Sequence, residues 1–230
     1  MDYFLQAFLS SIKLIFSFDQ EVFTIVWISL KISMTAVIFA SLLGVPLGFL
    51  VSLNKFSGKD LVIQLLNTLV ALPTVVVGLL LYGLLSRQGP LGEWAMLYTP
   101  AAMIIGQCVL VVPIIWSLSI SAASSADPRL AATCKALGAN TYQQGWLYFN
   151  EVRFAVMAAV VMGFGRAIGE VGIAMMLGGN IAGFTRTMTT AIALETSKGE
   201  FEFALALGLL LLTVAFLVNG LLQRFQRLSK

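Results

Sequence analysis

The stretch DPRLAATCKALGANTYQQGW, residues 127–146, is the longest polar-rich interruption in an otherwise apolar sequence. It separates residues 94–126, which contain no charge, from a second apolar segment that begins near Val152. Asp127 and Pro128 form a helix-start pattern, with Asp as the N-cap and Pro at the first helical position. Gly138 suits the left-handed conformation in which many helices end. We therefore predict a short helix over about 128–137 within a loop, where a partner protein can bind it.

The composition predicts the class of protein. Hydrophobic residues make up 59% of the 230 residues, charged residues 11%, and the mean hydropathy is +0.93. A soluble domain carries roughly 25% charged residues. The apolar runs are long and continuous, which indicates helices rather than the short alternating segments of a membrane barrel. The sequence thus predicts an all-α, polytopic membrane protein, folded as a single transmembrane domain over residues 1–230.

Several kinds of chemistry are disfavoured by what the chain contains. There is no histidine, which removes histidine-based acid–base catalysis and histidine metal ligation. Cys108 lies in an apolar segment and Cys134 in the polar stretch, so no structural disulfide is predicted. We expect no catalytic residue, no metal site and no cofactor bound by this chain. The start of the chain has Asp2 in place of a basic region, so it is not interpreted as a cleaved signal peptide.

Hydropathy predicts five spans, and the polar stretch becomes a loop between the third and the fourth. They cover about residues 22–53, 60–85, 94–121, a segment from near 152, and 203–222. Residues 2–18 are short and contain Lys13, so an interfacial helix is expected there, with a short sixth span as the alternative. Pro73 is expected to bend the second span, and the Gly44/Gly48 pair to permit close helix packing.

Two charged residues are predicted at membrane depth in the fourth span. Arg166 and Glu170 are four residues apart, so they can pair on one helix face. Charges at this depth are costly unless they pair or face a protein interior or water. The favoured interpretation is an internal ion pair, and the alternative is a polar element beside an anion pathway. Pro73 and Thr74 join this candidate set, because a broken helix is tolerated where protein or a cavity surrounds it.

The basic residues predict an orientation. With five spans, seven basic residues fall on one side and three on the other, so the first side is cytoplasmic and the C-terminus lies there. The first side has Lys55, Lys59, Arg129, Lys135, Arg224, Arg227 and Lys230; the second has Arg87, Arg186 and Lys198.

Four stretches together resemble a known family. They are residues 127–146, LVALPTVVVGLLLYGLLSRQGPLG at 69–92, GFGRAIGEVGIAMMLGGN at 163–180, and TRTMTTAIALETSKG at 185–199. The first is similar to the cytoplasmic "EAA" loop of ABC-transporter permeases, which forms a coupling helix that docks on the ATP-binding subunit. The other three resemble the permeases of the tungstate, molybdate and sulfate type, and the last is most like the tungstate branch.

The loop departs from the family pattern in two places. The Glu-Ala-Ala triplet falls on Ala132, Thr133 and Cys134, and the Leu-Pro that usually follows falls on Asn150 and Glu151. The coupling positions that the resemblance implies are Asp127, Pro128, Arg129, Leu130, Ala132, Lys135, Ala136, Leu137, Gly138 and Ala139.

The resemblance implies a type I importer permease in a bacterial or archaeal plasma membrane. It implies a homodimer, two ATP-binding subunits that carry ATP and Mg, and an extracytoplasmic oxyanion-binding protein. The chain has no GxxxxGK[ST] sequence, so the ATPase must be a separate chain. Tungstate is the expected substrate, with molybdate or sulfate as the alternative. The threonines and Arg186 of the loop 181–201 can solvate such an anion, although a short re-entrant or interfacial helix that contacts a partner is the favoured interpretation of this loop.

Three other classes of membrane protein fit the sequence less well than a permease subunit. An ion channel is disfavoured because no selectivity-filter sequence or dense acidic ring is present. A secondary transporter would need internal repeats and its own coupling charges, and no repeat is visible. An intramembrane enzyme would need a catalytic constellation that the sequence does not offer.

Overall fold

The computed structural model describes residues 2–17 and 19–228, and within them the secondary structure is helical. Several helices begin at local signals of the kind expected from sequence. Asp19 caps α2 through its side chain, Thr99 caps α5 ahead of Pro100, and Asn140 opens α7 with a capping box. The helices are α1 (Asp2–Phe16), α2 (Gln20–Leu53), α3 (Lys59–Val70), α4 (Thr74–Leu85), η1 (Gly92–Trp94), α5 (Pro100–Ser124), α6 (Pro128–Ala136), α7 (Thr141–Ile168), α8 (Gly172–Gly178), α9 (Met188–Lys198) and α10 (Phe201–Leu228).

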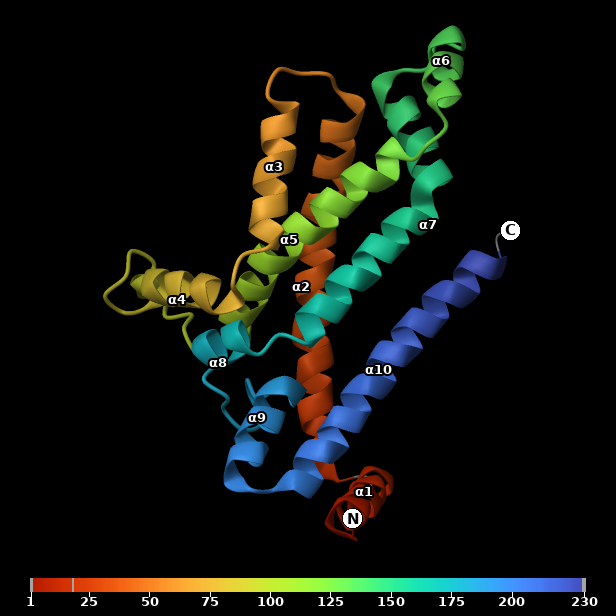
Figure 1. Ribbon diagram of the computed structural model, residues 1–230. Helices are drawn as coiled ribbons and strands as arrows, with labels where there is room; N and C mark the ends of the chain where they lie inside the picture. Colours follow the sequence, from red (N-terminus) through yellow and green to blue (C-terminus); the bar gives the residue numbers. More distant parts are fainter. Residues whose placement is uncertain (1, 18, 229–230) are drawn as a thin grey trace.

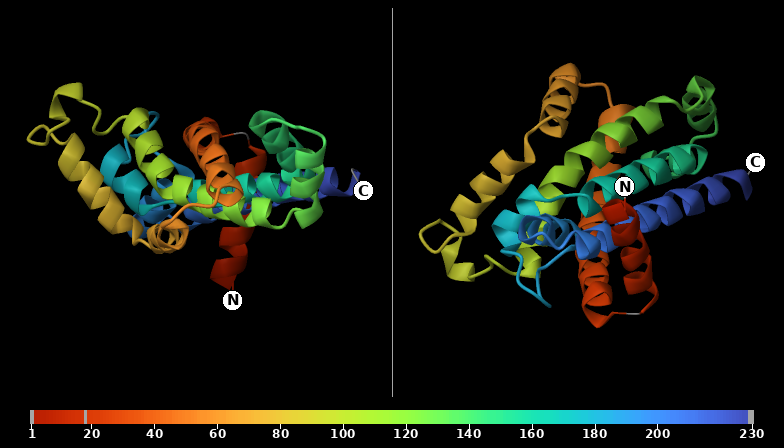
Figure 2. Two further views of the ribbon diagram at one scale, coloured as in Figure 1. Left: turned by 90° about the horizontal axis from the view of Figure 1, so that it is seen from above. Right: turned by 60° about the horizontal axis from the view of Figure 1, so that its bottom comes forward.

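The helices form an elongated bundle with two different ends (Figure 1). The α2–α3 connection and α6 lie at the upper end in Figure 1, whereas α1, α9 and the start of α10 lie at the lower end. This arrangement places the predicted cytoplasmic loops, around residues 54–58 and 125–140, at one end of the molecule. The two further views of Figure 2 show that α1 lies across the bundle rather than along it. Its length of 15 residues is short for a membrane span.

The core is centred on α2, α5 and α7. Gly44 and Gly48 of α2 face α5 at very short range, since a Cβ added at Gly48 would lie 2.4 Å from Cβ of Ser119. The predicted role of these glycines in close packing is confirmed. Gly165 of the Gly165/Gly169 pair, unlike Gly44 and Gly48, does not face a neighbouring helix at short range. A Cβ added at Gly165 would meet no atom within 4 Å. The GxxxG spacing of this pair therefore does not produce a close helix contact within the protomer.

In the part of the chain that the structure describes, four helices are long and apolar enough to span a membrane: α2, α5, most of α7 and most of α10. The predicted second span is divided into α3 and α4, which meet at an angle of 93°. The sequence predicted a bend at Pro73, and the structure shows a nearly right-angled break. Proline lacks the N–H and disfavours helical geometry in the residue before it. Residues 2–17 and 19–228 thus contain four candidate spans, or five if the bent pair crosses the membrane as one.

Three predicted boundaries were wrong. The third span does not begin at Trp94, because Ala95 and Tyr98 adopt positive φ values of 47° and 64° and the helix starts at Pro100. The fourth span begins earlier than predicted, at Thr141, because the capping box of Asn140 starts a helix in the polar stretch itself. The same span was predicted to contain both Arg166 and Glu170, but its helix ends at Ile168, and α8 follows after a break.

Candidate functional site

Helix α6, in the loop predicted to be cytoplasmic, has the local structure that the sequence predicts. Oδ1 of Asp127 accepts a hydrogen bond of 2.8 Å from the backbone N–H of Arg129, as an N-cap does. The helix ends at Ala136, and Gly138 has a φ of +69°, which confirms the predicted left-handed end. The N–H of Ala139 then donates to the carbonyl of Cys134 over 2.9 Å. These contacts fix the path of the chain on both sides of the helix.

One side of α6 packs on the bundle and the other leaves a large apolar side chain uncovered. Cys134 is buried, and Leu130 packs on the cluster that contains Ala126 and Tyr148. Leu137 is 80% exposed, and Tyr142 at the start of α7 is 82% exposed. Two such side chains beside a capped helix make a ready contact surface for a second protein. The side chains of Pro128, Ala132 and Lys135, which belong to the predicted coupling positions, lie outside the described part of the structure.

Two helix breaks meet halfway along the bundle. The break between α3 and α4 ends at Thr74, and the break between α7 and α8 ends at Gly172. A Cβ added at Gly172 would lie 3.2 Å from Oγ1 of Thr74 and 3.4 Å from Oε1 of Glu170. Farther along, a Cβ at Gly78 of α4 would lie 2.9 Å from Sδ of Met176. The structure therefore brings together the predicted candidates Pro73, Thr74 and Glu170, which come from two separate segments.

Arg166 and Glu170 form the ion pair that their spacing allows. Nη1 of Arg166 lies 2.6 Å from Oε2 of Glu170. The two residues were expected on one continuous helix, but Glu170 lies after the end of α7, where its Oε1 accepts the N–H of Ile173 over 3.1 Å. One carboxylate therefore pairs with Arg166 and also satisfies the first turn of α8. The side chain of Glu170 is 2% exposed and that of Arg166 is 37% exposed, so only the arginine is reachable from outside the protomer.

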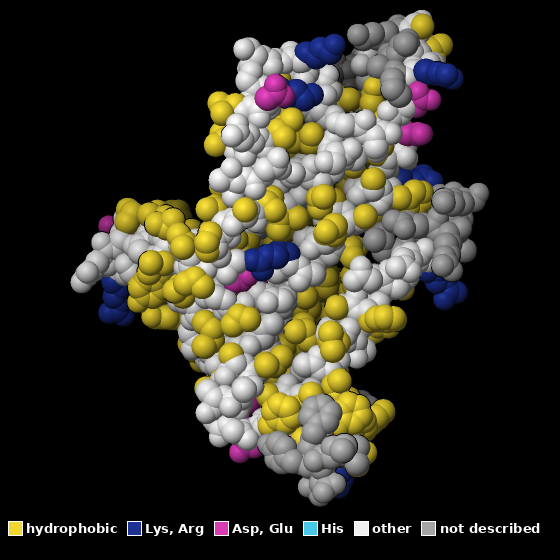
Figure 3. All heavy atoms as spheres, viewed as in Figure 1, with side chains coloured by type: hydrophobic (Ala, Val, Ile, Leu, Met, Phe, Trp, Pro, Cys, Tyr) yellow, Lys and Arg dark blue, Asp and Glu magenta, His cyan; other side chains and the backbone are white. Residues whose placement is uncertain are grey.

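The surface of the middle part of the bundle is mainly apolar. In Figure 3 most charged side chains lie towards the two ends or the margins of the view, and hydrophobic side chains cover much of the middle. One basic and one acidic side chain stand near the centre of the drawn face. A charge in such surroundings is costly unless it is paired, which is why the contact between Arg166 and Glu170 matters.

Sequence reasoning missed two polar residues that hold the α7–α8 break. Gln107 is 2% exposed, and its Nε2 donates to the carbonyl of Ala167 over 3.1 Å. Thr189 donates through Oγ1 to the carbonyl of Glu170 over 2.8 Å. A glutamine inside an uncharged apolar run was the available signal for Gln107. No local pattern could have paired Thr189 with Glu170, because α9 reaches it only in the folded bundle.

The threonines of residues 185–190 are engaged in the fold rather than exposed to an anion. Thr185, Thr187, Thr189 and Thr190 are all buried, with at most 7% of each residue exposed. Thr187 and Thr190 make the capping box that begins α9, and Oγ1 of Thr185 donates to the carbonyl of Gly178 over 2.5 Å. The favoured interpretation, a short helix in this segment, agrees with α9. The anion-solvating alternative does not fit these hydroxyl groups.

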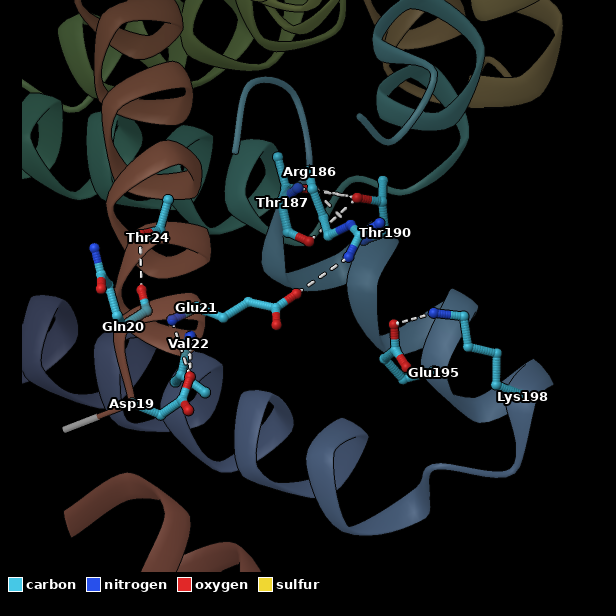
Figure 4. A network of polar contacts seen from close by, with 10 residues as sticks. All are labelled: Asp19, Gln20, Glu21, Val22, Thr24, Arg186, Thr187, Thr190, Glu195 and Lys198. Carbon is cyan, nitrogen blue, oxygen red and sulfur yellow. Dashed lines mark hydrogen bonds and ion pairs between the residues drawn. The ribbon is translucent and has the colours of Figure 1, made fainter. Parts of the chain in front are cut away.

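Charged residues gather near α9 at the lower end of the bundle (Figure 4). Nη1 of Arg186 lies 3.3 Å from Oε1 of Glu21, and Nζ of Lys198 lies 2.9 Å from Oε1 of Glu195. The first pair links the start of α2 to the segment before α9. The guanidinium of Arg186 is thus directed to a carboxylate, so it too is engaged in the fold.

The comparisons with known proteins agree with this architecture. The sequence profile of the binding-protein-dependent transport system inner membrane component matches residues 44–229. The chain belongs to this family. It is 39% identical over 226 residues to the tungstate uptake system permease protein TupB of Peptoclostridium acidaminophilum, covering 98% of this chain and 99% of that protein.

Two further relatives cover most of the chain. The TupB protein of Campylobacter jejuni is 37% identical over 227 residues, which are 99% of this chain and 95% of that one. A probable anion ABC transporter permease protein of Haloferax volcanii is 40% identical over 204 residues, 86% of this chain and 88% of that protein. The chain is therefore a permease of the ABC-transporter type, with several helices that cross a membrane.

Proposed function

We propose that this chain is the membrane-spanning subunit of an ATP-driven importer that moves tungstate into the cytoplasm. The observation that carries the proposal is the similarity, over nearly the full length of both proteins, to two tungstate uptake permeases. Molybdate is the closest alternative in chemical terms, because it is a tetrahedral dianion of nearly the same size and charge. We expect a separate extracytoplasmic protein to distinguish the two anions before delivery.

Residues 127–146 are proposed to couple this chain to a separate ATP-binding subunit. The capped helix α6, the left-handed Gly138 and the uncovered Leu137 give the loop a defined shape and an apolar contact. The proposed contact lets ATP binding bias the bundle between two conformations, since a partner shifts such an equilibrium only through different contacts in each state. ATP and Mg²⁺ would be held by the partner, and no cofactor is assigned to this chain.

The functional unit is proposed to contain two copies of this chain, two ATP-binding subunits and one extracytoplasmic anion-binding protein. The excess of basic residues near α6 and at the end of α10 supports a cytoplasmic location for that end and for the C-terminus. Residues Glu21, Arg186, Glu195 and Lys198 then lie on the outer side. We place the complex in a bacterial or archaeal plasma membrane.

We propose that the main role of Arg166 is structural, because its guanidinium compensates the charge of the buried carboxylate of Glu170. Because its side chain is 37% exposed where two helix breaks meet, it can also stand beside the anion pathway. Pro73 and Thr74 shape the same region by ending the first break.

The proposed function is tested by reconstitution. The chain, co-purified with its ATP-binding subunit, is placed in liposomes with the cognate binding protein, and internal tungsten is measured by mass spectrometry. We expect uptake that requires ATP, with sulfate a poor competitor. Uptake by this chain alone without ATP would instead indicate a secondary carrier. Isothermal titration of the binding protein with tungstate and molybdate decides between the two anions.

A further inference from the structure

The connection between α4 and α5, residues 86–99, borders an open cavity of about 610 Å³ at the far end of α4 (Figure 1). One wall is the last turn of α4 with the residues that follow it, and the other wall contains residues of the segment 95–98. A cavity of this volume can hold a small organic group, whereas a single tetrahedral oxyanion would leave most of it empty. Two leucines line it together with the polar side chains of Tyr82, Ser86, Arg87, Gln88 and Tyr98.

The second wall has an unusual backbone conformation that the fold holds in place. Ala95 and Tyr98 have φ values of 47° and 64°, and they are two of the three non-glycine residues with positive φ in the described part of the chain. The N–H of Tyr98 donates to the carbonyl of Leu177 over 2.8 Å. A Cβ added at Gly179 would lie 2.7 Å from Cδ1 of Tyr98, so the ring packs directly on that backbone. Such conformations persist only where the surroundings impose them, and they cluster at ligand sites.

The polar groups of the cavity are donors with capacity to spare. Arg87 is exposed, and no ion pair within residues 2–17 and 19–228 includes it. The hydroxyl oxygens of Tyr82 and Tyr98 lie 3.3 Å apart, and this contact uses only one of their two hydrogens. A guanidinium beside phenol hydroxyls is suited to the oxygens of a phosphate group, because arginine can donate two parallel hydrogen bonds to it.

The cavity lies where a membrane span ends. Helix α5 is a candidate span of 25 residues, so it is about 38 Å long. The hydrocarbon core of a bilayer is about 30 Å thick, which places both ends of α5 close to a membrane surface. The cavity lies directly before Pro100, at one of these ends. Trp94, one residue before the second wall, is 65% exposed, as is typical of aromatic side chains at a membrane surface.

An apolar surface adjoins the polar cavity. Leu79, Leu80 and Leu84 of α4 are 59%, 64% and 42% exposed, and α4 leads directly into the cavity wall. Phosphate donors at a membrane surface therefore stand beside exposed hydrocarbon side chains. This combination matches a molecule with an anionic head and an apolar tail, and neither a free anion nor a purely apolar ligand would use both parts.

We propose that this cavity binds the phosphate headgroup of a membrane phospholipid, with an acyl chain lying against the exposed leucines of α4. Arg87 supplies the charged contact, and the hydroxyl groups of Tyr82 and Tyr98 orient the phosphate beside it. The bound lipid then braces the connection between α4 and α5. The site is separate from the region of Arg166 and Glu170, and it does not depend on which anion the transporter carries.

The proposal is tested by lipid titration of the complete transporter, purified with its ATP-binding subunit and depleted of lipid. Phosphatidylglycerol is added, and bound lipid is counted by native mass spectrometry. Arg87→Gln is expected to weaken the tightest site about tenfold, the effect of losing one hydrogen bond to a charged group. Arg87→Lys should retain most of the affinity. Lys55→Gln removes an exposed charge from the α2–α3 connection and serves as the matched control. Equal affinity of the wild type and a folded Arg87→Gln variant would overturn the proposal.

A competition experiment distinguishes a lipid headgroup from a free anion. Inorganic phosphate shares the proposed contact with Arg87 but has no acyl chain to place against α4. We expect a hundredfold excess of inorganic phosphate to leave phosphatidylglycerol bound. Displacement of the lipid by inorganic phosphate alone would show that the cavity is a free-anion site, and would overturn the assignment to a phospholipid.

Photochemical capture in membranes tests where the lipid lies. Gln88 is replaced by benzoylphenylalanine, and Phe216 of α10, which is 82% exposed, is replaced in the same way as a control for bulk lipid. We expect phospholipid adducts at both positions, and a severalfold decrease caused by Arg87→Gln at position 88 only. Capture at position 88 that ignores Arg87→Gln would indicate bulk lipid. Capture of a second copy of the chain would show a subunit interface, and either result would overturn the proposal.

Discussion

Oγ1 of Thr189 donates a hydrogen bond of 2.8 Å to the backbone carbonyl of Glu170, and so joins α9 at the lower end of the bundle to the break between α7 and α8. A second contact holds the same helix, since the N–H of Met188 donates to Oγ of Ser29 over 2.7 Å. The segment before α10 is therefore anchored both to α2 and to the break beside Arg166.

Thr189→Val is expected to lower the stability of the purified protein by about 1 kcal/mol. Valine keeps the shape of threonine but cannot donate to the carbonyl of Glu170, and a typical buried hydrogen bond contributes about this much. The measurement is the apparent melting temperature in detergent. Thr189→Ser retains a hydroxyl and serves as the matched control, so equal melting temperatures for Thr189→Val and Thr189→Ser would show that the hydrogen bond contributes nothing measurable.

Local signals predicted the elements that depend on only a few neighbouring residues. The helix over 128–136, its Asp127 cap and the positive φ of Gly138 all followed from side-chain chemistry within one turn. The break at Pro73 was also visible, because proline removes a donor and restricts the residue before it. The angle of 93° between α3 and α4 could not be predicted from the sequence. It depends on how α4 packs against α8, for example at Gly78 and Met176.

The candidate site depends on contacts that sequence spacing does not reveal. Arg166 and Glu170 were predicted to pair from their four-residue spacing, which a broken helix happens to preserve. The contacts of Gln107 with Ala167 and of Thr189 with Glu170 link residues far apart in the chain. A period of hydrophobicity predicts which face of a helix is buried, but not which helix lies opposite. The placement of Thr74 beside Gly172 was hidden for the same reason.

Gly48→Ala is expected to destabilise the bundle by about 1–3 kcal/mol, the usual cost of overpacking. The added Cβ would lie 2.4 Å from Cβ of Ser119 and 3.1 Å from the backbone oxygen of Trp116, so α2 and α5 would have to separate. The measurement is again the apparent melting temperature, together with the yield of monodisperse protein. Gly83→Ala is the control, because a Cβ at Gly83 meets no atom within 4 Å. Equal behaviour of the two variants would contradict the proposed close packing.

Gly138→Val is expected to uncouple ATP hydrolysis from transport while the protein remains in the membrane. A β-branched residue at a φ of +69° is strained by about 1–2 kcal/mol, so the end of α6 and the position of Leu137 should change. The measurement is the ratio of anion transported to ATP hydrolysed in the reconstituted complex. Gly138→Asn tolerates the left-handed conformation better and should recover part of the ratio. Normal transport by well-expressed Gly138→Val would remove this role.

Removing Arg166 is expected to harm folding more than removing Glu170. The carboxylate of Glu170 is 2% exposed, whereas the side chain of Arg166 is 37% exposed. Arg166→Gln leaves a buried charge without its counterion, at a cost of about 3–5 kcal/mol in comparable settings. Glu170→Gln leaves a partly exposed cation and retains an oxygen that can accept the N–H of Ile173. The measurement is the amount of folded protein in the membrane and its apparent melting temperature.

The double variant Arg166→Gln/Glu170→Gln separates the structural role of the pair from a role in transport. With both charges removed, no charge is left unpaired, so folded yield should recover above that of Arg166→Gln alone. If Arg166 serves only the structure, anion uptake per folded transporter should recover as well. If Arg166 faces the anion, the double variant should fold and yet fail to transport. Small and additive effects of the two single changes on both quantities would mean that the residues are not coupled, since interacting residues show a clear departure from additivity.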